Sequence, residues 1–264
     1  MRIVEATSFG GPEVLRVREA DDLAAGPGQV VVGVVAADVL SVEAQLRTGW
    51  GAEWSGARPP FAPGTGVAGR VLSAGEGVDP SWVGRRVATR VSGGYAEQAL
   101  ADVDGLIALP DELGFPEAAA LLQVGAAAMS LIEAAELKPG SRVLVTGAGG
   151  GLGLVLVELA AAAGAEVTAS ATAVAKRQRA ERLGAAHTEP KGAYDVVFDG
   201  VGGETGARAF ELTAPGGRVF AYGVMEGSPP PSIPSSRRRV ASPSSAWSRS
   251  SSPPSGSEPW RSGP

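Results

Sequence analysis

The chain has 264 residues, of which 44% are hydrophobic, so it can form one large globular domain or two ordinary ones with real hydrophobic cores. It has no cysteine and a single histidine, His187, which excludes disulfides, iron–sulfur clusters, thiolate-bound zinc and histidine clusters, and disfavours a Ser-His-Asp triad. The formal net charge of -5 gives no reason to expect that the chain as a whole binds nucleic acid.

The longest apolar stretches are interrupted by glycine or by charged residues before they reach the roughly 20 residues that a membrane helix needs. The N-terminal sequence "MRIVEATSFGG" also lacks the apolar core of a signal peptide. We therefore expect a globular, cytoplasmic protein without a membrane partner.

Residues 1–118 contain short alternating runs separated by glycine and proline, a pattern that is typical of short strands joined by turns. We predict a compact, mostly β domain such as a small barrel. From residue 116 to residue 137 the hydrophobic period becomes helical, and Pro139 and Gly140 end this predicted helix. The expected strands of the first domain cover residues 14–19, 29–39, 68–75, 84–91 and 95–102.

Strands and helices then alternate, with connections of only a few residues. This alternation indicates an α/β domain with a doubly wound parallel sheet, which we place at residues 119–227. The expected strands cover residues 141–147, 165–171, 194–202 and 218–224, and the expected helices cover residues 151–164, 173–184 and 203–217.

The composition changes abruptly after residue 227. Residues 228–264 contain 14 serines and nine prolines, with five arginines and one acidic residue, Glu258. Such a segment buries too little apolar surface to offset the entropy cost of ordering, so we expect it to be disordered. Three interpretations stay open: a tail without function, a basic or phosphorylated arm, and the product of a frameshift near Arg239 that leaves the second domain incomplete.

The sequence "VLVTGAGGGLG" at residues 143–153 has five glycines within seven positions, between a predicted strand and a predicted helix. In that context Gly147 permits the sharp turn, Gly150 leaves room for a diphosphate, and Gly153 lets the helix pack closely on the sheet. The N–H groups of the first helical turn then face the phosphates. We predict a dinucleotide site, with a purely structural glycine turn as the alternative. The predicted phosphate-binding residues are Gly147, Ala148, Gly149, Gly150, Gly151, Leu152 and Gly153.

The end of the next strand indicates which cofactor is preferred. A site that prefers NAD usually carries an acidic residue there, but Glu166 comes too early in this strand, which ends at Ser170. Ser170 can donate a hydrogen bond to a 2′-phosphate, and Lys176 or Arg177 can supply positive charge, so the sequence favours NADPH. The alternative is that these basic residues form only a solvated helix face.

Ligands of doubly wound sheets bind at the carboxyl ends of the strands. Asp199 and Val201 follow the third strand of this domain, and Gly223 and Val224 end the fourth. We expect these four residues to line the nicotinamide side of the site. Asp199 either orients a ribose or a loop, or is an ordinary turn carboxylate.

Five segments in chain order carry a family resemblance: "FGGPEVLRVRE", "PPFAPGTGVAGRVLSAGEGV", "VGRRVATRVSGGYAEQALAD", "AAALLQVGAAAMSLI" and "LKPGSRVLVTGAGGGLG". Over about residues 1–226 the chain resembles the medium-chain dehydrogenase/reductase superfamily, in its zinc-free quinone oxidoreductase branch. The resemblance implies a GroES-like substrate domain at residues 1–118, an NAD(P)-binding Rossmann domain at residues 119–227, and an active site between them.

The resemblance also implies hydride transfer from NADPH to a small electron-poor acceptor, a quinone or another enone or carbonyl. Zinc-dependent relatives have a G-H-E motif where this chain reads Gly64-Thr65-Gly66, so no metal is expected. Zinc-free relatives usually carry an Asn, an Asp and a Tyr in the region where this chain offers Asp38, Glu43 and Trp50. Asp38 and Trp50 are therefore weak catalytic candidates.

Two rival hypotheses stay open. The first is an enoyl reductase that acts on acyl thioesters with the same fold and cofactor. The second is a catalytically inactive relative that binds nucleotides or RNA. The family also implies a homodimer formed through a strand after residue 224, but here the Ser/Pro-rich tail follows, which leaves the oligomeric state open.

Overall fold

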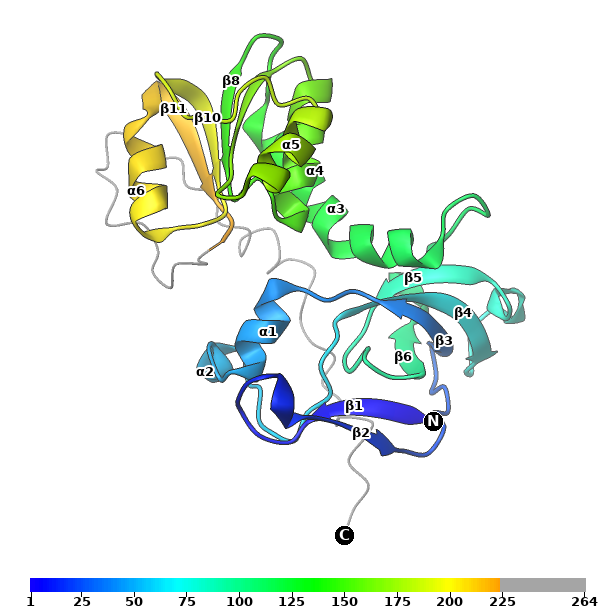
Figure 1. The fold of residues 1–264 in the computed structure, drawn as a ribbon. Helices are drawn as coiled ribbons and strands as arrows, with labels where there is room; N and C mark the ends of the chain where they lie inside the picture. The colour runs from blue at the N-terminus through cyan, green and yellow to red at the C-terminus, as the bar shows by residue number, and fades with distance from the viewer. Residues whose placement is uncertain (224–264) are drawn as a thin grey trace. The chain divides into compact units, whose positions relative to one another are not determined.

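The computed structural model describes residues 1–223, which form two compact units that divide after Gln123, within one long helix (Figure 1). The domain boundary expected after residue 118 lies in the same helix. Val224, the segment 228–264 and the frameshift placed near Arg239 lie outside the described residues.

The first unit holds a two-stranded sheet and a five-stranded antiparallel sheet with the order β6-β3-β4-β5-β7. All five strands that the sequence predicts are confirmed as β2 to β6, whereas β1, β7, α1 and α2 are additional elements. The elements are β1 (Arg2–Ala6), β2 (Leu15–Glu19), β3 (Gln29–Ala37), α1 (Ser41–Arg47), α2 (Ala52–Ser55), β4 (Gly66–Ala74), β5 (Arg86–Arg90), β6 (Gln98–Asp102) and β7 (Ile107–Ala108), with 3-10 turns at Pro12–Val14, Pro80–Trp82 and Val103–Gly105.

The core of the first unit follows from the alternation of its strands. Side chains at every second position of a strand point to the same face of the sheet, and here these positions carry small β-branched residues. Val30 and Val32 of β3, Val67 of β4 and Val87 of β5 are fully buried in one cluster. Ala68 and Ala88, at the alternate positions of β4 and β5, are also buried, in a second apolar cluster.

Helix α3 (Phe115–Ala135) belongs to both units. It is the one helix within residues 1–223 that is long and apolar enough to cross a membrane, with an 18-residue stretch of mean hydropathy 1.6. Glu117 and Glu133 lie near its ends and Gly125 lies between them, so glycine and charge interrupt its apolar residues as expected from the sequence. Its N-terminal half packs Ala118 into the core of the first unit, and its C-terminal half packs Leu131 into the core of the second.

The second unit is an α/β unit with a parallel four-stranded sheet in the order β11-β10-β8-β9, which confirms the predicted doubly wound architecture. After β8 the chain adds β9 on one side and then β10 on the other, so the strand order reverses between β8 and β10. The elements are β8 (Arg142–Thr146), α4 (Gly151–Ala162), β9 (Glu166–Ser170), α5 (Val174–Arg182), β10 (Tyr194–Asp199), α6 (Gly203–Glu211) and β11 (Thr213–Ala221).

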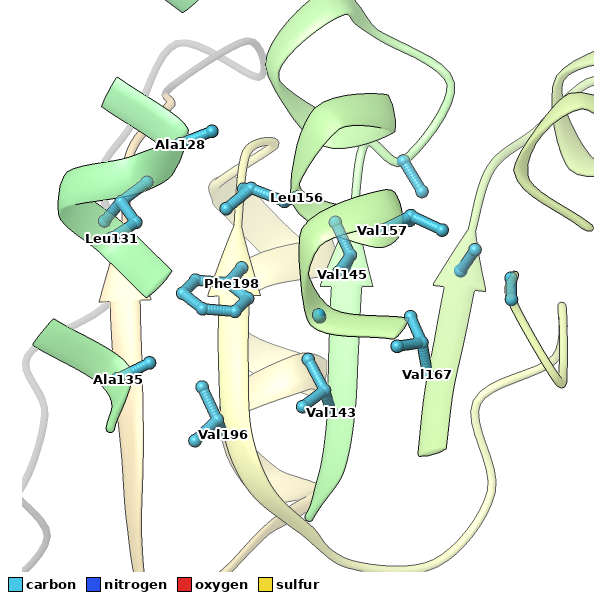
Figure 2. Packing of buried hydrophobic residues seen from close by; sticks show 14 of the residues in the cluster. Ala128, Leu131, Ala135, Val143, Val145, Leu156, Val157, Val167, Val196 and Phe198 are labelled. Carbon is cyan, nitrogen blue, oxygen red and sulfur yellow. The ribbon is translucent and has the colours of Figure 1, made fainter. Parts of the chain in front are cut away.

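Helices cover both faces of this sheet. Figure 2 shows Val143, Val145 and Phe198 of the strands packed against Leu131 of α3 and Leu156 of α4, in one buried cluster. The alternate residues face the opposite side, where they pack against α6. Because both faces are buried, the strands are almost continuously apolar, as the sequence pattern predicts.

One predicted element is wrong. Residues 213–217 are expected to continue the third helix of this domain, but α6 ends at Glu211 and β11 begins at Thr213. Pro215 cannot continue a helix, and Gly216 has a φ of 79°, which helical residues do not adopt. The extra residues form an irregularity in the pairing of β11 with β10.

Candidate functional site

The glycine-rich turn connects β8 to α4 as the sequence predicts. Gly147 has a φ of 64°, in the left-handed region that glycine adopts without strain. A Cβ atom on Gly153 would lie 2.5 Å from the carbonyl oxygen of Gly147, so only glycine lets the helix approach the turn this closely. No side chain caps the N-terminus of α4, which begins after Gly150. The N–H groups of its first turn are therefore available to an anion.

Two glycines of the turn are not required by the protein itself. A Cβ on Gly150 would meet protein atoms no closer than 3.4 Å, and one on Gly151 no closer than 3.9 Å, which are ordinary contact distances. Gly150 also has an extended backbone that any residue adopts. Neither packing nor backbone strain explains these glycines.

The end of β9 lies beside the same turn. The N–H of Ala148 donates to the carbonyl oxygen of Ser170 at 3.1 Å. The stem of Lys176 packs over Gly149, where a Cβ would lie 2.5 Å from Cβ of Lys176. The structure thus brings Ser170 and Lys176 to the glycine turn, as a site for a 2′-phosphate requires.

Arg177 is placed differently from Lys176. Its Nη1 atom donates to the carbonyl oxygens of Ala171 at 2.9 Å and Thr172 at 2.8 Å. These bonds fold the loop between β9 and α5 around the guanidinium group. Arg177 therefore shapes the loop. Lys176, in the same helix, is an exposed residue.

The third and fourth strands end next to the turn. Val201 lies beside Gly147, where a Cβ would be 3.3 Å from Cγ2 of Val201. The N–H of Gly223 donates to the carbonyl oxygen of Asp199 at 3.3 Å, and a side chain on Gly223 would collide with the backbone of Gly200. The carboxylate of Asp199 is buried behind these loops, with an exposed fraction of 1%.

The first unit contains a separate polar cluster, which we call the acidic cluster: Asp38, Glu43, Thr65, Tyr95 and Gln123. Glu43 is buried and accepts hydrogen bonds from the Tyr95 hydroxyl at 2.6 Å and the Thr65 hydroxyl at 2.9 Å, with a third from a backbone N–H. The Gln123 amide donates to Asp38 at 2.6 Å and to Thr65 at 2.9 Å. One hydrogen-bond network therefore joins two buried carboxyl groups.

The two carboxyl groups of the acidic cluster differ in their partners. Asp38 is 5% exposed, and its Oδ1 atom is buried without a hydrogen-bond partner among the described residues. Burial raises the pKa of Asp38; the Gln123 amide partly offsets this effect, and the charge of Glu43 adds to it. Burial and the bond to Glu43 also raise the pKa of Tyr95, which keeps its hydroxyl a donor.

The first unit also contains Trp50, the second catalytic candidate, and Thr65, which replaces the histidine of the G-H-E motif. Trp50 is 40% exposed and lies between α1 and α2, outside the acidic cluster. Within residues 1–223, no three His, Cys, Asp or Glu side chains come together as metal ligands would. Thr65, which stands in the place of the metal-binding motif, instead donates to Glu43.

Both units of the chain match known protein families. The family model for the alcohol dehydrogenase GroES-like domain matches residues 26–111, and the model for zinc-binding dehydrogenases matches residues 151–250. The quinone oxidoreductase of Mus musculus is 39% identical over 153 residues, which are 56% of this chain and 45% of the mouse protein. The chain thus spans about half the length of the curated relatives it matches.

Solved structures give the same fold over most of the chain. The quinone oxidoreductase of Coxiella burnetii is 26% identical with a TM-score of 0.79, covering 84% of this chain and 75% of that one. A mycobacterial protein solved in complex with NADPH is 27% identical with a TM-score of 0.80, covering 90% of this chain and 78% of that one. These likenesses confirm the expected combination of a GroES-like and a Rossmann-type fold.

Proposed function

Because this chain belongs to the medium-chain dehydrogenase/reductase superfamily, in its quinone oxidoreductase branch, we propose that it is an NADPH-dependent oxidoreductase. The proposed reaction transfers a hydride to a small electron-poor acceptor, a quinone or another enone or carbonyl compound. The mycobacterial structure solved with NADPH, which is 27% identical to this chain, supports the choice of cofactor.

The observation that carries the proposal is the glycine turn. Gly150 and Gly151 leave open a cradle that a Cβ atom would fill, although no protein neighbour requires glycine there. The cradle lies at the N-terminus of α4 and at the point where the strand order reverses, which is where dinucleotides bind in doubly wound sheets. The residues present therefore fit the diphosphate of a dinucleotide.

In this proposal the protein binds and orients, and the cofactor supplies the hydride when bound. The backbone of residues 147–153 holds the diphosphate, Ser170 and Lys176 hold the 2′-phosphate, and Val201 and Gly223 border the nicotinamide half. We assign no proton donor to the reduction, because both oxygens of Asp38 lie within the acidic cluster and the indole of Trp50 does not titrate near neutral pH.

Replacement of Lys176 by alanine tests the proposed preference for NADPH. We expect K176A to raise the dissociation constant for NADPH about ten- to a hundredfold, because the loss of one charge-assisted hydrogen bond costs roughly 1.5–3 kcal/mol. The dissociation constant for NADH is expected to stay within about twofold, because NADH has no 2′-phosphate. Titration of the intrinsic fluorescence with each nucleotide measures both constants.

Arg182→Ala is the matched control, since it removes an exposed positive charge from the last turn of the same helix. It is expected to change neither constant by more than about twofold, because exposed charges at this separation are largely screened. If K176A weakened NADPH and NADH binding equally, Lys176 would not contact the 2′-phosphate and the sequence basis for NADPH preference would fail.

A panel of acceptors tests the reaction itself. We expect NADPH oxidation with a quinone or a simple enone, measured as loss of absorbance by the nicotinamide. Turnover with an enoyl thioester but not with quinones would select the enoyl reductase hypothesis. A rise in melting temperature with NADPH, without turnover of any acceptor, would select an inactive nucleotide-binding relative.

A further inference from the structure

The carboxylate of Asp199 is enclosed in the protein, so a bound dinucleotide cannot touch it. Asp199 is 1% exposed, and its Oδ1 atom accepts hydrogen bonds from Thr146 Oγ1 at 2.5 Å and from the N–H groups of Val201 at 3.1 Å and Gly202 at 3.3 Å. All three donors belong to segments that border the glycine turn. These contacts are those of a group that holds a loop in place.

Thr146 connects this carboxylate to the glycine turn. It is the last residue of β8, it is buried, and it directly precedes Gly147. Its hydroxyl donates to Asp199 and accepts from the N–H of Gly200 at 3.1 Å, so both of its bonds fix its orientation. Because β8 and β10 are the strands between which the order reverses, this bridge sets the spacing of the loops that follow these two strands.

The end of β11 is attached to the same bridge. The Tyr222 hydroxyl donates to the carbonyl oxygen of Thr146 at 3.1 Å, and the N–H of Tyr222 donates to the carbonyl oxygen of Asp199 at 2.8 Å. Burial, with a contribution from the charge of Asp199, raises the pKa of Tyr222, so its hydroxyl stays a donor. Three strand ends are thereby joined behind the glycine turn.

We propose that Asp199 and Thr146 are positioning residues that hold the glycine turn in the shape that binds the diphosphate, an inference that rests on the proposed NADPH site. The bridge uses one carboxylate oxygen. Oδ1 accepts all three bonds, whereas Oδ2 lies against Gly206 of α6 and has no hydrogen-bond partner among the described residues. An asparagine can present the same oxygen, so the position of this atom matters and the negative charge does not.

Two pairs of substitutions test the bridge, with two ligands. Thr146→Val and Asp199→Ala remove its bonds, whereas Thr146→Ser and Asp199→Asn keep the bonding atoms. We expect the first two to raise the dissociation constant for NADPH about tenfold or more, and the second two to stay within about threefold of the original protein. The dissociation constant for adenosine 2′-phosphate, which lacks the diphosphate, is expected to stay unchanged in all four variants.

Tyr194→Phe is the control for general damage. It removes a buried hydroxyl that accepts from the N–H of Lys191, at the opposite end of β10 from Asp199. It is expected to lower the melting temperature without changing the affinity for NADPH. If T146V lost affinity equally for NADPH and for adenosine 2′-phosphate, the proposed bridge would be overturned, because the result would indicate damage to the whole unit.

The remaining outcomes separate the bridge from the proposed function. If D199N lost as much affinity for NADPH as D199A, the charge would matter and the proposal would be wrong. If D199A did not fold, the comparison of T146V with T146S decides, because the valine keeps the shape of the side chain. Failure of the unmodified protein to bind NADPH would overturn the proposed function itself, and normal binding by T146V would overturn only the bridge.

Discussion

Gly150→Ala is expected to weaken NADPH binding by about ten- to a hundredfold while leaving the stability of the protein nearly unchanged. The added methyl group would occupy the open cradle beside the glycine turn, where no protein atom except the carbonyl oxygen of Gly147, at 3.4 Å, lies within 4 Å. Overpacking a close contact costs roughly 1–3 kcal/mol, which converts to this loss of affinity.

Two small effects on stability oppose each other at this position. Alanine is a poorer N-cap than glycine, which costs a few tenths of a kcal/mol up to about 1 kcal/mol. Alanine also restricts the unfolded chain and fits the extended backbone of Gly150, which gains about 0.4–1 kcal/mol. The melting temperature without ligand is therefore expected to change by only a few degrees.

Gly153→Ala is the matched comparison, because it places the same methyl group against the protein and not against the ligand. Its Cβ would lie 2.5 Å from the carbonyl oxygen of Gly147 and 2.8 Å from Cα of Ala148, and both are backbone atoms. We expect G153A to lower the melting temperature by several degrees. Calorimetry of both variants, with and without NADPH, separates the two effects.

Normal NADPH binding by G150A would contradict the cradle, and with it the argument that the glycines of this turn serve a dinucleotide. The purely structural interpretation of the turn would then be preferred. A large loss of stability in G150A would contradict the statement that no protein neighbour requires glycine at this position.

The second unit could be predicted largely from sequence because its signals are local. A buried apolar strand, a glycine turn and an apolar helix are adjacent in the chain, and their order fixes a parallel sheet with the turn at one edge. The exception is the start of β11. There Pro215 and Gly216 mark a break in regular structure, which the sequence pattern predicts as the end of a helix, although they lie within an irregular strand.

The acidic cluster could not be predicted in the same way. Its hydrogen bonds join residues that are 22 to 85 positions apart in the sequence, so no spacing or periodicity connects them. The sequence shows acidic residues at 38 and 43, but it does not show that Glu43 collects three donors while Oδ1 of Asp38 is buried without a partner among the described residues. The sequence likewise does not decide between the two roles of Asp199, because its burial and its hydrogen-bond partners depend on the fold.

Asp38→Asn is expected to stabilise the protein at neutral and alkaline pH, by about 1–3 kcal/mol, because it removes a buried charge that Glu43 repels. The pKa of Asp38 is raised in the folded state by burial and by Glu43. The stability that this group contributes is therefore complete below the unfolded pKa of about 4 and is lost as the pH rises through the folded value. The gain from the asparagine, which is neutral at every pH, should grow over the same range.

Glu43→Gln removes the other carboxylate and is expected to have the opposite effect. Glu43 accepts three hydrogen bonds, from Leu40 N–H, Thr65 and Tyr95, and an amide cannot accept all of them in the same geometry. Urea unfolding of both variants between pH 4 and pH 9 measures the difference. Stabilisation by D38N that is the same at every pH would contradict this account. A stabilising E43Q would show that repulsion between the carboxylates of Asp38 and Glu43 dominates the cluster and that the hydrogen bonds to Glu43 matter little.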